Sequence, residues 1–357
     1  MYLIQMEKFN LFSKYLKYYK DILDTRRIKK YDQGDSSKRD FKLVSTRNHE
    51  AQCIELFEEV FKEKMTKEFW NWKYAPHGMK LRGICAVRKG KVVGHYNGMA
   101  RNILYFGKHK KAIASGDTML SPKDRGGIKQ NSPFYNMIKT WAPMNFGIRK
   151  EFILAYGFPN KRVFRLAEII GLYTTVDTIS EINWNIKDYE AQNDCKMIIY
   201  TNEKSQQDTL IKVWQQMAHD FNKEIIGVRN TQYITHRYFN HPKFKYLTYF
   251  INDSKGNTKA FIALKKENDK MLLMDIVASK SNFDSAINGA LVICKSKNIA
   301  ILNSWITTSK KKLFMHYNAS LRQTDIIIPS NPDLPGYVKP EIVIDKWFLM
   351  YGDTDFI

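Results

Sequence analysis

The order of expected strands and helices constrains this chain most, because the same order occurs twice in its 357 residues. Over 41–182, the spacing of apolar residues predicts strand, helix, three consecutive antiparallel strands, helix, strand, helix and strand. Residues 195–357 repeat this order, starting from the strand-like run KMIIYT. Such an order is typical of an α+β fold (α/β/α layers) with a mixed, mostly antiparallel sheet, and not of a doubly wound parallel sheet.

Short stretches in the two halves also match residue by residue. FWNWKYAPH at 69–77 aligns with YITHRYFNH at 233–241, and this alignment pairs Phe69 with Tyr233, Lys73 with Arg237, Tyr74 with Tyr238 and His77 with His241. The repeated order of elements also places Asp117 on Asp275, Ser121 on Ser279 and Asn160 on Ser309. We therefore predict a tandem duplication with a first copy at 41–182, a linker at 183–194 and a degenerate second copy at 195–357.

The N-terminal region has a different character. Apolar and aromatic residues recur at helical spacing over 5–30, with Lys and Arg between them, which predicts an amphipathic helix. A polar linker at 31–40 completes the segment 1–40. Such a helix packs on the body of the protein, or it rests on a membrane surface or a partner.

Charge and cysteine content limit the partners and the compartment. The formal net charge of +21 suits a polyanion such as nucleic acid, an anionic membrane or a phosphorylated small molecule, but the basic residues are dispersed along the chain. The four cysteines are far apart, and neither His77 nor His95 has a ligand partner at a fixed spacing, so we expect no metal and no disulfide framework. No signal peptide is evident at the start, and we expect a cytoplasmic protein.

The stretch ASGDTMLSPKDRGGIKQ at 114–130 carries the most chemistry. In a regular strand Ser115, Asp117, Met119 and Ser121 share one face, and Pro122 ends the strand. A turn containing Arg125, Gly126, Gly127 and Lys129 then leads to a helix that starts at Ser132 and Pro133. Exposed backbone amides, a helix N-terminus and two cations are suited to a diphosphate, although a plain connecting turn has the same composition. The spacing matches neither the P-loop nor the Rossmann fingerprint.

Together with YGFPNKRVFRLAEIIGL at 156–172, this stretch resembles the GNAT N-acetyltransferase superfamily, in its tandem bacterial form. The resemblance covers 41–182, with 195–357 as a weaker second copy. It implies two GNAT-like domains, with acetyl-CoA (or a longer acyl-CoA) bound by the first. One departure is that the glycines follow Arg125 directly, one residue earlier than the family pattern.

The resemblance also assigns roles to residues. It implies a cofactor site made of Met119, Leu120, Ser121, Arg125, Gly126, Gly127, Ile128, Lys129 and Asn160. Asp117 is then the expected proton acceptor for the amine, and Tyr173 the expected acid for the leaving thiolate. The expected acceptor-binding residues are Trp70, Trp72, Tyr74 and Tyr156. Packing, capping or solvation alone explains each of these residues as well.

These expectations lead to one main function and two alternatives. The main one is transfer of acetyl from acetyl-CoA to the amine of a small acceptor, such as an amino sugar or a nucleotide-linked amino sugar. An aminoacyl-tRNA-dependent (Fem-like) transferase also uses tandem copies of this fold, and the charge of +21 would suit tRNA, but that chemistry needs no diphosphate turn. A non-catalytic binding or scaffold protein is the second alternative, because the second copy lacks the Arg-Gly-Gly turn.

Overall fold

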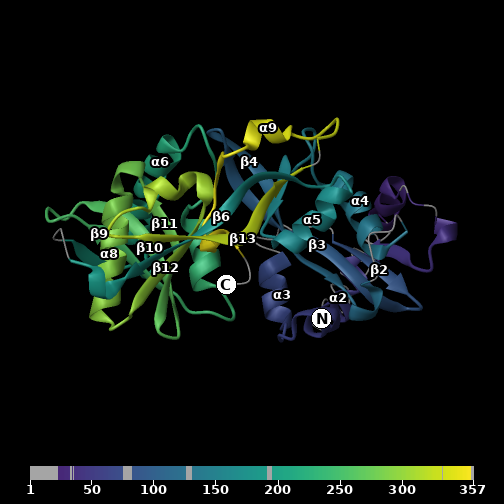
Figure 1. Cartoon of the computed structure of the whole chain (residues 1–357), viewed down its shortest axis with the longest axis horizontal. Helices are drawn as coiled ribbons and strands as arrows, with labels where there is room; N and C mark the ends of the chain where they lie inside the picture. The colour runs from purple at the N-terminus through teal and green to yellow at the C-terminus, as the bar shows by residue number, and fades with distance from the viewer. Residues whose placement is uncertain are drawn as a thin grey trace, which may run out of the picture. The chain divides into compact units, whose positions relative to one another are not determined.

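The computed structural model describes residues 23–32, 34, 36–74, 83–125, 131–190, 195–331 and 333–354. The chain divides into two compact units. Unit 1 comprises Met1–Met99 and Ser115–Glu151, and unit 2 comprises Ala100–Ala114 and Phe152–Ile357. Two long strands, β3 (Lys91–Tyr105) and β4 (Lys108–Leu120), contribute residues to both units (Figure 1).

Unit 1 packs two helices on strands through an apolar cluster. Its other elements are η1 (Ser36–Lys38), β1 (Lys42–Ser45), η2 (Thr46–Asn48), α2 (Glu50–Phe61), α3 (Lys67–Tyr74), β2 (Ile84–Arg88), η4 (Pro122–Asp124) and α4 (Pro133–Asn145). Leu56 and Phe57 of α2 and Trp70 of α3 pack in one buried cluster with Cys85 and Met119 of the strands. The helices are therefore held by burial of their apolar faces.

Local signals set the helix ends of this unit. The Ser132 hydroxyl accepts a hydrogen bond from the Tyr135 amide, and Pro133 occupies the first turn of α4, which confirms the predicted start. Of the predicted N-terminal amphipathic helix, residues 5–22 lie outside the described part of the chain. A helix at 23–31 is described, and its Asp24 carboxylate accepts a hydrogen bond from Arg47 at 3.0 Å. This end of the segment packs on the body of unit 1.

The first sheet has the strand order β1-β2-β3-β4-β5, with β5 at Leu154–Gly157. Strand β2 runs antiparallel to both β1 and β3. Phe106 and Gly107 connect β3 to β4 with positive φ angles of 49° and 74°, as a two-residue hairpin turn requires. Strand β8 (Ile225–Gly227) pairs with β3, and β14 (Trp347–Phe348) pairs with β8.

The second sheet lies wholly within unit 2 and has the order β13-β6-β12-β11-β10-β9-β7. Among the described strands of this sheet, only β11 and β12 pair in parallel, so the sheet is mixed and mostly antiparallel, as predicted. Its strands are β6 (Thr174–Asn185), β7 (Lys196–Ile199), β9 (Leu247–Asn252), β10 (Thr258–Glu267), β11 (Lys270–Ala278), β12 (Ile301–Thr307) and β13 (Ser320–Ser330).

Helices flank this sheet, and its central strands are almost completely buried. Helices α6 (Lys204–Asp220) and α8 (Phe283–Ser296) pack on β10 and β11 (Figure 1). The remaining elements of unit 2 are α5 (Lys161–Ile169), η5 (Ile186–Asp188), α7 (Thr231–Ile234), η6 (Thr235–Phe239), η7 (Lys280–Asn282), η8 (Thr308–Leu313), α9 (Pro340–Val343) and η9 (Tyr351–Asp353). Two mixed sheets flanked by helices confirm the predicted fold class.

The structure differs from the sequence-based expectations in two places. The repeated order predicts a last helix in the second copy, over KKKLFMHYNAS at 310–320. The structure has only the short η8 there, because Tyr317 and Asn318 adopt positive φ angles of 55° that a helix cannot include. Strand β6, expected in the first copy, lies in the second sheet between β13 and β12. The domain limits 41–182, 183–194 and 195–357 stay a prediction.

Candidate functional site

The end of β4 and the turn after it form the candidate cofactor site in unit 1. The strand ends at Leu120, and the Ser121 amide still donates to the Val93 carbonyl at 2.9 Å, before Pro122 begins η4. Met119 is fully buried, and the Ser121 hydroxyl donates to Glu59 at 3.2 Å. The predicted end of the strand at Pro122 is thus confirmed.

The turn itself is described only as far as Arg125. The exposed Arg125 side chain folds back, and its Nε donates to the Leu120 carbonyl at 3.2 Å. Arg88 forms an ion pair with Asp124, which fixes the start of the turn. Gly126, Gly127, Ile128 and Lys129 lie outside the described residues, and their contacts with a diphosphate stay predicted.

Asp117 interrupts β4 where a regular strand was expected. Its φ of +45° departs from extended geometry, so the expected one-faced alternation of Ser115, Asp117, Met119 and Ser121 is broken at this point. The Lys73 ammonium lies 2.5 Å from the Asp117 carboxylate, and the Tyr74 hydroxyl donates a hydrogen bond to the same oxygen. Both partners come from the last turn of α3, so Asp117 tethers that helix to the strand.

The matched residues of the second copy form the same kind of contact in unit 2. The Tyr238 hydroxyl donates to Asp275 at 2.9 Å, as Tyr74 does to Asp117. Strand β11 also has an irregularity here, because the β10 pairing skips from Asp275 to Leu273. Bulges of this kind redirect side chains and end regular pairing. The alignment of the two halves therefore corresponds to a shared local structure.

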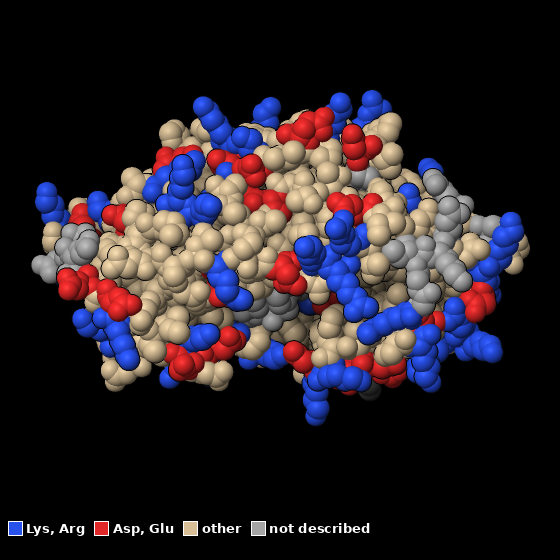
Figure 2. All heavy atoms as spheres, viewed as in Figure 1, with Lys and Arg blue, Asp and Glu red and all other residues tan. Residues whose placement is uncertain are grey.

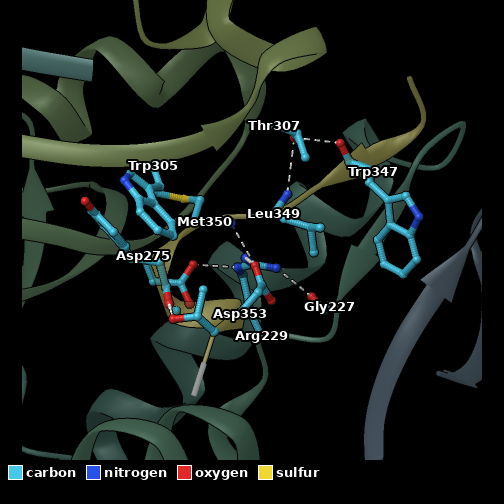
Figure 3. Close-up of polar contacts among 12 residues, drawn as sticks. Gly227, Arg229, Asp275, Trp305, Thr307, Trp347, Leu349, Met350 and Asp353 are labelled. Carbon is cyan, nitrogen blue, oxygen red and sulfur yellow. Dashed lines mark hydrogen bonds and ion pairs between the residues drawn. The ribbon is translucent and has the colours of Figure 1, made fainter. Parts of the chain in front are cut away.

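The counter-charge to the carboxylate differs between the copies. Asp275 is fully buried and accepts a hydrogen bond from Arg229 Nε at 2.7 Å, while Arg229 also donates to Asp353 at 2.6 Å (Figure 3). Burial raises the pKa of Asp275, whereas Arg229 and Arg101 hold the pKa of Asp353 below its ordinary value against the effect of burial. Arg237, aligned with Lys73, donates instead to the Gly352 carbonyl at 3.1 Å.

The predicted acceptor-binding aromatics of α3 pack together. The ring centroids of Trp70 and Tyr74 are 4.4 Å apart, and both side chains are buried in unit 1. Trp72 is partly buried and stacks on Phe69 at 5.7 Å. The structure thus brings Trp70, Tyr74 and Asp117 together, and their contact with an acceptor stays a prediction.

His95, for which the sequence predicted no metal-binding role, is also a member of this group. The side chain on β3 is completely buried, its ring lies 5.4 Å from Trp70, and neither ring nitrogen has a hydrogen-bond partner. Burial lowers the pKa of His95 to about 3. The positive charge of Lys73 lowers this pKa further, whereas the Asp117 backbone raises it. A histidine within an apolar strand gave no signal of this environment.

Three further predicted site residues belong to unit 2. The Asn160 side chain accepts from the Val163 amide at 3.0 Å, which confirms that it caps α5. Tyr156 is buried against Trp347 with a centroid separation of 4.7 Å, and burial raises the pKa of its hydroxyl. The Tyr173 ring lies 6.0 Å from Phe164. Their catalytic or binding roles stay predicted.

No cluster of three or more His, Cys, Asp or Glu side chains in the described ranges is placed to hold a metal ion. Within the same ranges, no helix has the length and apolar character needed to cross a bilayer.

Comparisons with known proteins identify the fold. No family model matches the sequence, and no curated protein matches it. Among solved structures, one similar protein is a conserved protein of unknown function from Enterococcus faecalis V583, described as a probable N-acyltransferase. Its TM-score is 0.62 at 11% sequence identity, and the match covers 82% of this chain and 72% of the Enterococcus chain. A GCN5-related N-acetyltransferase from Kribbella flavida has a TM-score of 0.56 at 11% sequence identity. The match covers 83% of this chain and 72% of the Kribbella chain.

A third structure extends the comparison to another acyl donor. The N-myristoyltransferase of Saccharomyces cerevisiae with bound myristoyl-CoA has a TM-score of 0.52 at 12% identity, covering 84% of this chain and 80% of its own. These likenesses agree with the two mixed sheets and with the order of elements described above. The chain therefore has the fold of the GNAT N-acetyltransferases.

Proposed function

We propose that this chain is an acyl-CoA-dependent N-acyltransferase that transfers acetyl from acetyl-CoA to the amine of a small acceptor. The observation that supports this most is the end of β4, where an irregular strand at Asp117 leads through Met119 and Ser121 to Pro122 and the exposed Arg125. In the fold that the chain shares with its structural neighbours, this strand is where the sequence resemblance places the cofactor.

The residues present fit the chemistry of a diphosphate. Arg125 is exposed and cationic, and the chain beyond the turn enters α4 through Ser132 and Pro133, so a helix N-terminus follows the turn directly. Backbone amides and a helix dipole favour an anion at such a position. Acyl-CoA, when bound, supplies the acyl group as an activated thioester.

The chain's own groups then have three tasks. The backbone of Met119 and Ser121 would orient the thioester, and polarising its carbonyl would fall to an amide other than that of Ser121, which already donates to the Val93 carbonyl at 2.9 Å. The acceptor nitrogen forms a bond to the acyl carbon while the carbon–sulfur bond breaks, the amine proton passes to Asp117 directly or through water, and the thiolate is protonated. We propose Tyr173 for that last proton on the resemblance alone, and Tyr156 and Asn160 as binding residues on the same basis.

The choice of acceptor is the least constrained part of the proposal. Aromatic side chains on α3 and the positive net charge favour a phosphorylated or nucleotide-linked amino sugar. The amine of such a compound is the nucleophile that the reaction needs.

Thermal unfolding with and without acyl-CoA tests the proposal. We expect acetyl-CoA to raise the unfolding temperature of the full chain, and Arg125→Ala to weaken this effect by at least about ten-fold in apparent affinity. Lys123→Ala, an exposed lysine in η4, is the matched control and should keep the effect. A series from acetyl-CoA to myristoyl-CoA gives the preferred chain length. No stabilisation by any donor at millimolar concentration would contradict the proposal, and aminoacyl-tRNA would then be the next ligand to examine.

A further inference from the structure

A surface of unit 2 combines lysines from several segments with exposed isoleucines. We call the lysines the lysine patch and define it as Lys108, Lys110, Lys223, Lys280, Lys310 and Lys346. These residues come from the β3–β4 hairpin, the loop after α6, η7, η8 and the segment before β14. Because the segments are distant in sequence, the fold is what gathers them.

Hydrogen bonds join these segments to one another. The Phe106 amide of the hairpin donates to the Glu224 carbonyl at 3.0 Å, and the Ile225 amide donates to the Lys346 carbonyl at 2.8 Å. The Lys310 ammonium donates to the Asp345 carbonyl at 2.8 Å. The hairpin, the loop at 222–225, η8 and the segment at 345–346 are therefore neighbours on one surface.

Positive charge is in excess on this surface. The Glu224 carboxylate is shared by Lys310 at 2.5 Å and Lys280 at 3.9 Å, so one acid faces two bases. The Asp220 carboxylate accepts a hydrogen bond from the Lys280 backbone amide at 2.9 Å. Asp345 is an exposed acid next to Lys346 in the sequence. Lys108, Lys110, Lys223 and Lys346 are all exposed. Figure 2 shows Lys and Arg side chains near α6, with Asp and Glu side chains among them and at α9.

Exposed aliphatic side chains lie directly beside the patch. Ile342 and Ile344 are 46% and 45% exposed and lie within four residues of Lys346. The exposed Glu341 beside Ile342 is paired with Lys339 at 3.8 Å. At the hairpin, the half-buried rings of Tyr105 and Phe106 adjoin Lys108. Isoleucine side chains add nothing to the recognition of a nucleic acid, whereas they gain free energy when they enter the acyl region of a lipid bilayer.

We propose that this face of unit 2 binds an anionic membrane surface, with the lysine patch contacting lipid phosphates and Ile342 and Ile344 inserting between the headgroups. Lysines near an anionic leaflet each contribute to binding, and exposed apolar side chains add a second, salt-independent contribution. Interfacial aromatic rings are typical of such surfaces. The inference is independent of acyl transfer, since it uses only residues of this surface.

Vesicle co-sedimentation of the full chain tests the proposal. We expect binding to vesicles of phosphatidylcholine with phosphatidylglycerol, and little binding to phosphatidylcholine alone. The triple variant K108E/K110E/K346E should lose binding by roughly 100-fold or more. The double variant I342S/I344S should weaken it by about ten-fold at high and at low salt alike.

The control reverses the same number of charges elsewhere in unit 2. Lys255, Lys295 and Lys297 are exposed at the β9–β10 hairpin and the end of α8, so K255E/K295E/K297E should keep more than half of the vesicle binding if the patch is specific. Equal loss in both triple variants would overturn the proposal, as would undiminished binding by K108E/K110E/K346E. Binding of a single-stranded RNA oligomer without vesicle binding would also overturn it and assign the surface to nucleic acid.

Discussion

The Tyr74 hydroxyl donates a hydrogen bond to the Asp117 carboxylate, and the aligned Tyr238 hydroxyl donates to Asp275 at 2.9 Å. Each tyrosine lies on a short helical segment, and each aspartate lies at an irregular point of the strand that this segment meets. The two halves of the chain thus keep the same tether between helix and strand. Only the base that balances the carboxylate has changed, from Lys73 to Arg229.

The Lys73–Asp117 pair gives the first prediction. Asp117→Asn should destabilise the protein by about 3 kcal/mol, because it leaves the Lys73 charge, whose side chain is only 2% exposed, without its anion. The double variant Lys73→Met with Asp117→Asn should recover part of this loss, which urea unfolding of the four proteins in the cycle would measure. Additive effects of the two substitutions would contradict the pairing.

The same substitution separates two roles for Asp117 in acyl transfer. If Asp117 accepts the amine proton, Asp117→Asn lowers kcat by a factor of about 100 or more and changes the dependence of kcat on pH. If it only anchors α3, the remaining folded enzyme keeps the wild-type pH profile. A full kcat versus pH comparison under conditions where both proteins are folded decides between the roles.

The network around Arg229 gives a prediction for unit 2. Arg229→Met removes the guanidinium that donates hydrogen bonds to the buried carboxylates of Asp275 and Asp353. The free energy of unfolding in urea should therefore fall by about 3–5 kcal/mol. Arg322→Met removes an exposed ion pair with Glu181 on the second sheet and serves as the control, with unfolding unchanged within error. Similar losses in both variants would show that the buried network has no special importance.

Local sequence patterns predicted the helix caps and most of the order of elements. Ser132 and Asn160 act within three residues of their own helices, so sequence alone is enough to identify them. The Arg229–Asp353 contact joins residues 124 positions apart, and no periodicity reports such a pairing. His95 gave no signal for the same reason, because its burial depends on packing by Trp70 and Tyr74 from another element.

His95 gives a prediction about pH. Its pKa is about 3 in the folded protein and near its ordinary value of 6.5 when unfolded, so between these values the unfolded chain binds the extra proton. The stabilisation is complete above pH 6.5 and is lost as the pH falls towards 3. Between pH 7 and pH 5 this amounts to about 2 kcal/mol.

Comparison with His95→Leu measures that contribution. When the pH of the urea unfolding experiment is lowered from 7 to 5, the free energy of unfolding should fall by about 2 kcal/mol less in the variant than in the wild type. His95→Gln also lacks the ionisable ring but differs from leucine in its packing, so it serves as a control. Its free energy of unfolding should show the same reduced dependence on pH as that of His95→Leu. Parallel pH dependence in the wild type and both variants would mean that His95 is accessible to protons in the folded state.

Isothermal titration calorimetry of the full chain with acetyl-CoA tests the central claim most directly, because it reports both binding and the number of sites. The account predicts one equivalent per chain, since the first copy carries the Arg125 turn and the sequence of the second copy has no Arg-Gly-Gly turn after β11. Arg125→Ala should weaken this binding while the Arg322→Met control keeps it. Absence of heat up to millimolar acyl-CoA, or two equivalents bound per chain, would contradict the account.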